Sequence, residues 1–358
     1  MKKSIALAAA LALCLSLLAG CGGSTTGRAD SSVSSASASA STSAAEERAP
    51  GLYVDGAAVE ADPVMTIGAH EVSFDEYRYH YLSILNAYGG REAELWAGED
   101  GEANREKLKN TVEQNLMAFY AFEDLAAEHD IALTDEERQT ALEAVQGLAD
   151  QMGGDESFEE VLAQQYFTRD LYTNMLLSNQ LEEKVIRQVY GDDIRADVDK
   201  NYVHAQHILI KFAEDAASGD ASASAAEPDH SAELAKAEEV LQKIEAGESF
   251  DDLMAQYNED GGQPAEGYTF TTGQMVQEFE DAAFALKDGA VSGIVETTYG
   301  YHILKRLPID EAYVEENLPN MMSNEVKEKI STALTGVMDG LSVAYCDAYG
   351  QISPDTLF

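Results

Sequence analysis

Cysteine, tryptophan and positive charge are scarce in this chain of 358 residues. It contains three cysteines, Cys14, Cys21 and Cys346, and one tryptophan. Because Cys14 lies in an N-terminal apolar run, no framework of disulfides is available, and the fold has to be held by packing. Lys and Arg number 23 against 65 Asp and Glu, which gives a formal net charge of −42. Such a surface disfavours nucleic acid and is repelled by anionic lipid, so we expect no nucleic-acid partner.

Several sequence patterns of catalytic and ligand-binding sites are also absent. The chain has no phosphate-binding loop, no His/Cys cluster with metal-ligand spacing and no nucleophile elbow. We therefore expect no cofactor and no metal. Repeated strand–helix units are missing too, which argues against a solute-binding protein built from two α/β lobes.

The first twenty residues resemble a secretory signal peptide. Two lysines precede an apolar run from Ile5 to Leu18, which is short for a membrane span and suits the apolar core of a signal. The run leads into L-A-G-C, which resembles a bacterial lipobox, with the cysteine at position 21. That resemblance implies cleavage before Cys21 and a lipid on its thiol; an ordinary signal peptide with a cysteine nearby is the alternative. We predict a signal at 1–20, lipid attachment at Cys21, and a location on the extracytoplasmic face of the bacterial cell membrane.

Residues 21–50 are dominated by Ser, Ala and Thr and show no apolar period, so we predict a disordered tether. As a random coil of about thirty residues it would span roughly 30 Å, enough to lift a folded body clear of the lipid headgroups. A second stretch of low complexity, 214–228, is rich in Ala, Ser and Asp. We expect it to form an exposed loop.

From about residue 64 to 195 the sequence predicts mainly helices. Three Ser or Thr residues followed at the third position by Glu are expected to cap helices, namely Ser73, Thr134 and Ser157. The second of these starts an expected apolar stripe of Leu142, Val145 and Leu148. A further amphipathic helix is predicted from Thr168 to Tyr190.

The segment from Tyr313 to Ala344 is also expected to be helical, with a break near Pro319. Its apolar stripe includes Val326, Ile330 and Leu334. A single amphipathic helix needs a partner to cover such a stripe, and the helices before residue 200 are the obvious one. We therefore predict one helical domain made of residues 51–200 and 309–358, split by the insertion of residues 201–308.

Residues 203–307 begin and end with predicted strands that enclose three helical stretches. Ile208 and Ile210 alternate with His207 and Leu209, as a half-buried strand requires. If the closing strand is its neighbour in one sheet, His207 and His302 lie on the same face. The helical stretches are expected at 234–244, 250–257 and 279–286, with Ser231 and Ser249 available as N-caps of the first two.

Four segments of this region resemble the parvulin family of peptidyl-prolyl isomerases. They are Q-H-I-L-I-K from residue 206, F-D-D-L-M-A-Q-Y-N-E-D from 250, G-Q-M-V-Q-E-F-E-D-A-A-F-A-L from 273 and T-Y-G-Y-H-I-L-K from 298. They occur in the family's order and close to its spacing. With its flanking helices and lipobox, the whole chain resembles the PrsA-like foldase lipoproteins and the related SurA-type chaperones. The resemblance implies an α+β fold: a small antiparallel sheet with surrounding helices, inserted into a mainly helical chaperone domain.

The resemblance also implies catalytic residues. His207 and His302 match the paired histidines at the floor of the parvulin site, and Thr297 matches a hydroxyl residue close to them. Asp260 falls where the family carries Asp or Cys near the substrate carbonyl. Each has a structural alternative, since strand histidines are commonly core residues and Asp260 could be a solvated loop carboxylate.

Four residues are expected to contact the substrate: Met275, Phe279, Phe270 and Tyr299. Met275 and Phe279 match the walls of the family's proline pocket, although both could be ordinary core residues. The segment 266–270 is shorter than the family's glycine-rich segment and lacks its leucine. Tyr299 stands where several parvulins have serine, and its bulk could narrow the pocket or cover the histidines.

Two functions are compatible with these features. The first is a tethered foldase that catalyses cis/trans isomerisation of X-Pro bonds in unfolded or newly secreted polypeptides. The second is a holdase chaperone whose parvulin-type domain binds peptide with little or no turnover. No run of basic residues follows His207, so a preference for phosphorylated Ser/Thr-Pro is not expected. The sequence leaves the client proteins and the oligomeric state open, a homodimer included.

Overall fold

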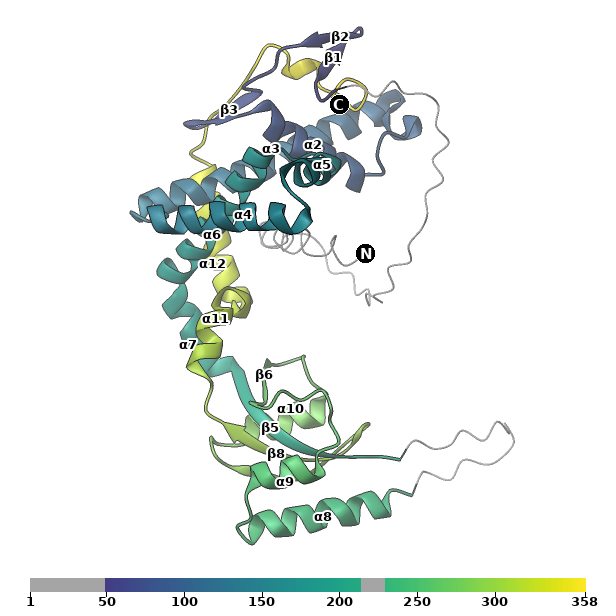
Figure 1. Ribbon diagram of the computed structural model, residues 1–358, viewed down its shortest axis with the longest axis vertical. Coiled ribbons are helices and arrows are strands. Elements are labelled where there is room, and N and C mark those ends of the chain that lie inside the picture. Colours follow the sequence, from purple (N-terminus) through teal and green to yellow (C-terminus); the bar gives the residue numbers. More distant parts are fainter. Residues whose placement is uncertain (1–48, 214–228) are drawn as a thin grey trace, which may run out of the picture. The chain divides into compact units, whose positions relative to one another are not determined.

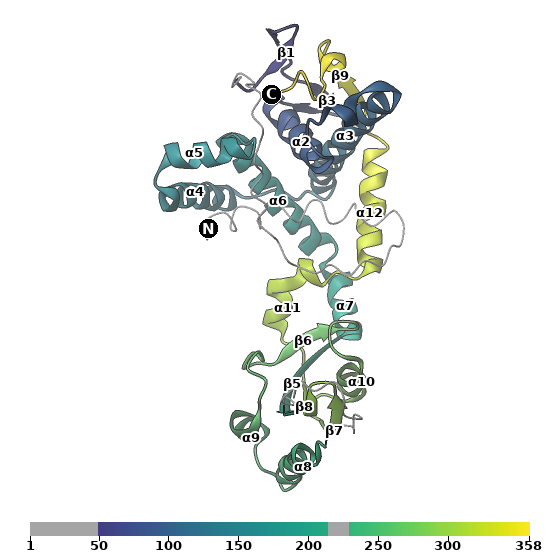
Figure 2. The ribbon, with the colours of Figure 1, turned by 90° about the vertical axis from the view of Figure 1, so that its right-hand side faces the viewer.

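The computed structural model describes residues 49–213 and 229–358. The predicted signal peptide, the predicted lipid attachment site Cys21, nearly all of the predicted tether and the predicted loop at 214–228 lie outside the described residues. The rest forms two compact units (Figures 1 and 2). The helical unit comprises the described residues up to Tyr190 together with Asn324–Phe358, and the inserted unit comprises Gly191–Ser323. Among the described residues, no helix combines the length and the apolarity needed to cross a bilayer.

The helical unit follows the predicted pattern of capped helices. Its helices are α2 Phe74–Ala87, η2 Ala93–Trp96, α3 Gly98–Glu128, α4 Asp135–Met152, α5 Asp155–Gln164, α6 Arg169–Val189, α12 Asn324–Met338 and η4 Tyr349–Gln351. Ser73 caps α2 by accepting a hydrogen bond from the Glu76 amide at 3.2 Å. Thr134 caps α4 in a reciprocal capping box with Glu137. Both caps were predictable from the spacing of the residues.

Two local predictions in this unit are wrong. Ser157 does not cap a helix, because α5 already begins at Asp155, directly after Gly153 and Gly154 with positive φ. Leu142 does not belong to a buried stripe, since it is 48% exposed. The face that α4 buries consists of smaller residues, Ala141, Val145 and Ala149. Small side chains allow a closer approach of neighbouring helices, which the hydrophobic pattern alone did not indicate.

The helical unit also contains two small antiparallel sheets beside its helices. One pairs β1 Leu52–Val54 with β2 Ala57–Val59, and the other has the order β4-β3-β9, formed by His70–Val72, Met65–Ile67 and Val343–Tyr345. The predicted helix up to Ala344 is therefore too long. Helix α12 ends at Met338, a turn around Gly340 follows, and Val343 pairs with Ile67.

Helix α12 finds the partner that its apolar stripe requires, because it packs against α3. Val326, Ile330 and Leu334 are at most 3% exposed. The residues after α12 return to α3 as well, where Lys109 donates a hydrogen bond to the carbonyl of Tyr349 at 2.9 Å. Segments from the two ends of the chain thus share one core.

The inserted unit is built on an antiparallel sheet with the order β6-β5-β8-β7. The strands are β5 Tyr202–Lys211, β6 Tyr268–Thr271, β7 Val291–Thr297 and β8 Gly300–Leu307. Helices α8 Ser231–Glu245 and α9 Phe250–Tyr257 cover one face, and α10 Gln277–Ala285 covers the other (Figure 1). Strand β5 is consequently buried on both faces, not half-buried as its alternation predicted. Ser249 caps α9 as predicted, whereas Ser231 is the first residue of α8 and not its cap.

The inserted unit extends beyond residues 201–308 at both ends. Helix α7 Gly191–Asn201 precedes the sheet, and α11 Glu311–Asn317 and η3 Leu318–Met321 follow it. Helix α7 packs on η3, and Arg195 donates to Glu315 at 2.6 Å. Pro319 lies in η3, between α11 and α12, at the predicted break. These contacts attach both flanking segments to the inserted unit.

Candidate active site

Strands β5 and β8 bring the two predicted histidines together. In their antiparallel register Leu209 lies opposite His302, and Leu304 lies opposite His207. The two histidines are therefore diagonal neighbours on one face of the sheet. Their ring centroids are 5.1 Å apart with an interplanar angle of 89°, and each residue is 4% exposed. The pair forms the floor of a nearly enclosed site.

Thr297 holds His302 from the neighbouring strand. Its hydroxyl oxygen accepts a hydrogen bond from the Tyr299 amide at 3.1 Å and lies 2.8 Å from Nε2 of His302. The Thr297 hydroxyl also lies 3.4 Å from the carbonyl oxygen of Gly300, which is a second acceptor for its proton. Nδ1 of His302 has no hydrogen-bond partner within the described part of the chain. The buried threonine therefore fixes the orientation of this ring.

The position of Asp260 follows from how the segment 258–263 binds to β5. Strand β6 pairs only with residues 202–205, which leaves the edge of β5 beyond them open. The side chain of Asn258 accepts a hydrogen bond from the Leu209 amide, and that of Gln263 accepts one from the His207 amide, each at 2.9 Å. These two side chains accept the backbone hydrogen bonds that a neighbouring strand would otherwise accept from this edge of β5. The carboxylate of Asp260, which lies between them in sequence, is thereby held beside His207.

Asp260 is an ionised carboxylate at the rim of the site, with its side chain 23% exposed. It accepts hydrogen bonds from the Gly262 amide at 2.9 Å and from the Tyr268 hydroxyl at 3.1 Å. Burial raises the pKa of Asp260, but these two hydrogen bonds lower it, and the net effect is a lowered pKa. One carboxylate oxygen lies 3.3 Å from Nε2 of His207, without the alignment of a hydrogen bond.

Both histidines are neutral at physiological pH. Burial lowers the pKa of His207 to about 4, although the nearby charge of Asp260 acts in the opposite direction. Burial also lowers the pKa of His302 to about 4, and the proximity of His207 adds to the effect. A site with two neutral imidazoles and no activated nucleophile offers hydrogen bonding and shape, not covalent chemistry or a strong base.

An aromatic wall stands against the histidine pair. The Phe279 ring meets His207 and His302 edge-on, with centroids 5.2 and 5.4 Å away. Phe270 is 1% exposed and lies behind Phe279, with ring centroids 5.7 Å apart, so it supports the wall and does not reach the surface. Met275 packs on the same cluster and is only partly buried. Its amide donates to the buried carboxylate of Glu280 at 2.9 Å, which fixes the turn that carries it.

Tyr299 does not cover the histidines. It is 61% exposed, and the structure ties it to the site only through its amide, which donates to Thr297. Of the eight residues predicted for the site, the two histidines form a pair and five others gather around it, with Phe270 beneath the surface. The Tyr299 side chain points to solvent.

The sequence reasoning missed Tyr268. Its hydroxyl donates to Asp260, and its ring centroid lies 6.0 Å from that of His207. The neighbouring Gly267 has φ +102°, and a Cβ there would come within 2.6 Å of the Ala205 carbonyl oxygen. Only glycine fits this turn into β6. Tyr268 stands in the segment that departs from the family's pattern, and a departure by itself did not indicate a role.

Comparisons with known proteins agree with this architecture. A family model described as PPIC-type PPIASE domain matches residues 193–307. A second family model, described as SurA-like N-terminal domain, matches residues 50–186. Foldase protein PrsA of Oceanobacillus iheyensis is 30% identical over 237 residues, which cover 63% of this chain and 70% of that protein. Foldase protein PrsA of a Geobacillus species is 36% identical over 140 residues, 37% of this chain and 40% of that protein. Foldase protein PrsA 1 of Bacillus cereus is 35% identical over 133 residues, 36% of this chain and 39% of that protein.

The inserted unit, with its antiparallel sheet and histidine pair, is therefore a peptidyl-prolyl isomerase domain of the parvulin type. The helical unit carries the SurA-like N-terminal domain. Together they place the chain in the PrsA foldase family.

Proposed function

We propose that this protein is a membrane-tethered foldase that accelerates the cis/trans isomerisation of X-Pro bonds in secreted polypeptides outside the cell membrane. The single observation that carries the proposal is the edge-to-face pair His207 and His302 against Phe279, with Asp260 at the rim. The helical unit holds the unfolded client while its X-Pro bonds are isomerised.

The isomerisation of an X-Pro amide makes and breaks no covalent bond. Rotation about an X-Pro amide has a barrier of roughly 18–20 kcal/mol because the C–N bond has partial double-bond character. The catalyst only has to bind the twisted amide better than the planar one. Phe279 and Met275 supply an apolar surface for the pyrrolidine ring, which removes water that would solvate the more polar planar amide.

The charge of Asp260 also favours the twisted amide over the planar one. The oxygen of a planar amide carries more negative charge than that of a twisted amide, in which resonance is lost. A fixed carboxylate near this oxygen therefore disfavours the planar form. The hydrogen bonds from Gly262 and Tyr268 hold the carboxylate in place and keep it ionised. The neutral histidines hold the floor of the site and move no proton in this scheme.

The charges around the site favour certain substrates. Asp260, Glu259 and Glu266 lie on the segment beside β5, and Glu259 is paired with Lys236. A phosphate before proline would meet this acidic surface, whereas a Lys or Arg before proline would be attracted to it. We propose that basic residues before proline are preferred.

One observation favours the alternative, a holdase with little turnover. His207, His302, Thr297 and Phe279 are each at most 5% exposed, so a substrate reaches them only at the rim or after a small movement. The intact chain should be assayed with Lys-Pro and Glu-Pro peptides of otherwise equal sequence. Acceleration of both reactions, larger for Lys-Pro, supports the isomerase. If neither peptide isomerises faster than the uncatalysed rate, the isomerase proposal is wrong and the holdase alternative is supported.

The proposed tether has its own test. Replacing Cys21 by serine removes the thiol that would carry the lipid. We expect the parent protein in the membrane fraction of the producing cells and the Cys21→Ser variant in the medium. Equal membrane association of the two proteins would contradict lipid attachment at this residue.

A further inference from the structure

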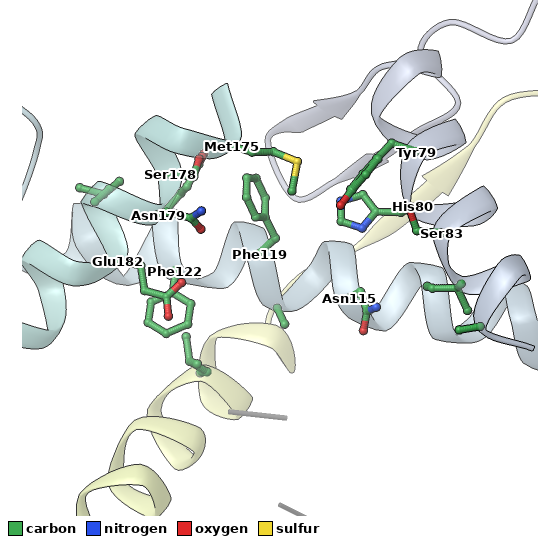
Figure 3. A pocket seen from close by; sticks show the side chains of 16 residues that line it. Tyr79, His80, Ser83, Asn115, Phe119, Phe122, Met175, Ser178, Asn179 and Glu182 are labelled. Carbon is green, nitrogen blue, oxygen red and sulfur yellow. The ribbon is translucent and has the colours of Figure 1, made fainter. Parts of the chain in front are cut away.

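The helical unit contains a cavity far removed in sequence from the isomerase residues. It has a volume of about 230 Å³ and is lined by residues of α2, α3, α6 and α12 (Figure 3). Much of its wall is apolar and is formed by Tyr79, Ile84, Phe119, Phe122, Met175 and Leu334. Helices from the two ends of the chain thus build it together.

Polar groups lie at both ends of this apolar wall. Figure 3 shows His80 and Asn115 on one side of Phe119, and Asn179 and Glu182 on the other. Nε2 of His80 is enclosed and has no hydrogen-bond partner among the described residues. Burial lowers the pKa of His80 to about 4, so the ring is neutral and can accept or donate one further hydrogen bond.

Acidic side chains line the cavity. The described residues of its lining include Glu123 and Glu182 and no Lys or Arg. Glu123 also accepts a hydrogen bond from Ser178 at 2.9 Å, which holds its carboxylate at the edge of the cavity. A ligand that carries negative charge, such as a fatty acid or an anionic lipid headgroup, is therefore disfavoured, and a ligand next to positive charge is favoured.

We propose that this cavity binds an aromatic side chain from a basic segment of an unfolded polypeptide. The proposal rests on the holding role in the proposed function and names the chemistry that this role recognises. A cavity of about 150 Å³ is known to accept benzene, so a cavity of about 230 Å³ has room for one aromatic side chain. The rings of Phe119 and Tyr79 provide edge and face contacts, and the flexible Met175 adapts to the shape of the ring.

The acidic groups of the protein are the reason that we expect basic residues next to the bound aromatic side chain. The whole chain carries a formal net charge of −42, and the side chain of Glu123, which is 32% exposed, lies at the edge of the cavity. Lysines next to the aromatic residue would approach this carboxylate without entering the apolar space. Acidic segments would be repelled by the same groups.

The test uses the full chain and a fluorescently labelled peptide of Gly, Ser and Lys with one central Trp and no proline. Leaving out proline keeps the peptide from being a substrate of the isomerase domain. Binding is followed by anisotropy and compared with a Trp→Ala peptide and with a peptide whose lysines are replaced by glutamates. We expect each change to weaken binding at least about tenfold. Equal binding of the Trp and Ala peptides, or stronger binding of the Glu peptide, overturns the proposal.

Variants of the protein locate the binding. Ser83→Phe places a ring in the cavity from α2 and should abolish the difference between the Trp and Ala peptides. Ala163→Phe adds the same ring at an exposed position of α5 and should bind as the parent does. Glu123→Gln should reduce the preference for lysine over glutamate. Binding of the Trp peptide to Ser83→Phe with the parent's affinity contradicts the proposal.

Two further measurements separate this inference from others. The fluorescence of Trp96, which is buried in the helical unit, reports whether Ser83→Phe is folded. If that variant does not fold, the peptide series on the parent chain decides alone. Suppression of aggregation of an unfolded client by the parent tests the holding role itself. Aggregation suppressed without any dependence on the aromatic residue means that the cavity proposal fails and the holding role stands.

Discussion

Both units bury a neutral histidine, but they use it differently. In the inserted unit, His207 and His302 touch each other and Phe279, and Thr297 lies within hydrogen-bond distance of His302. In the helical unit, Nε2 of His80 faces a cavity without a partner among the described residues. The first arrangement is largely completed by the chain itself and favours a precise geometry. The second leaves space and one ring nitrogen without a partner among the described residues.

One carboxylate from each unit shows a similar difference. Hydrogen bonds to Asp260 in the inserted unit outweigh its burial and keep its pKa low. In the helical unit, burial raises the pKa of Glu76 to about 7, although a hydrogen bond from Tyr120 acts against it. The inserted unit thus holds a fixed charge where chemistry is proposed. The helical unit holds a carboxyl group that changes charge near neutral pH.

The largest effect is expected from His302→Ala. The substitution removes the ring that packs on Phe279 and one of the hydrogen-bond partners of Thr297. We expect the isomerisation rate constant kcat/KM to fall on the order of 100-fold and the inserted unit to lose about 2–4 kcal/mol of stability. His230→Ala, which removes a histidine stacked on Phe212 in the same unit, is the matched control and should retain activity. Equal activity of His302→Ala and the parent would remove the histidine pair from the mechanism.

The second largest effect is expected from acidification, which should change the stability of the two units differently. The pKa values of His207 and His302 fall from 6.5 to about 4 on folding, so between these values the unfolded state binds more protons. Lowering the pH from 7 to 5 should therefore destabilise the inserted unit, on the order of 2 kcal/mol per histidine. In the helical unit the pKa of His80 is lowered in the same way, so His80 also makes acidification destabilising. The pKa of Glu76 rises from 4.5 to about 7 on folding, and this gain in stability on acidification offsets the effect of His80.

This contrast can be measured within one protein. Trp96 fluorescence reports unfolding of the helical unit, and hydrogen exchange of the β5 and β8 amides reports opening of the inserted unit. We expect faster exchange in β5 and β8 at pH 5, after correction for the intrinsic rate, with little change in the Trp96 transition. An inserted unit that is equally stable at both pH values would contradict the depressed pKa values of its histidines.

A smaller effect is expected from Asp260→Asn, which keeps the size of the side chain and removes its charge. The account predicts a loss of roughly tenfold in kcat/KM and a weaker preference for Lys-Pro over Glu-Pro. Asp281→Asn removes one charge from an exposed position on α10 and serves as the control. If both variants lose the same small amount, the charge of Asp260 acts only through the overall field of the protein.

The smallest predicted effect concerns Tyr268→Phe. The variant loses the hydrogen bond to Asp260 but keeps the ring beside His207. Since one hydrogen bond contributes about 0.5–1.5 kcal/mol, kcat/KM should fall roughly two- to tenfold. The bond lowers the pKa of Asp260, so its loss should move the acidic limb of the pH–rate profile to higher pH. A fall in rate with an unmoved acidic limb would assign Tyr268 a packing role only.

Much of the inserted unit could be predicted because its site is fixed by strand register. Once residues 203–212 and 300–307 are antiparallel neighbours, the alternation of side chains puts His207 and His302 on one face. Asp260 and Phe279 came from a resemblance, which carried the tertiary information that periodicity lacks. Tyr268 was missed because its role depends on how β6 docks beside Ala205, and no local pattern contains that contact.

The helical unit was less predictable beyond its caps. The N-caps at Ser73 and Thr134 are local, and the structure has both, with a reciprocal capping box at Thr134. The strand at Val343–Tyr345 pairs with residues almost three hundred positions earlier, so its sequence could only be read as an extension of α12. The cavity is likewise a product of how four helices cross, since each of them shows an ordinary apolar stripe on its own.

The most direct test of the division of labour between the units is a double variant, Asp260→Ala with His302→Ala, compared with the parent in two assays. One assay measures isomerisation of a Lys-Pro peptide, and the other measures suppression of aggregation of an unfolded client. The account predicts that the double variant loses the acceleration and keeps the suppression. A double variant that still isomerises the peptide at the parent's rate would contradict the assignment of the active site to the histidine pair and Asp260.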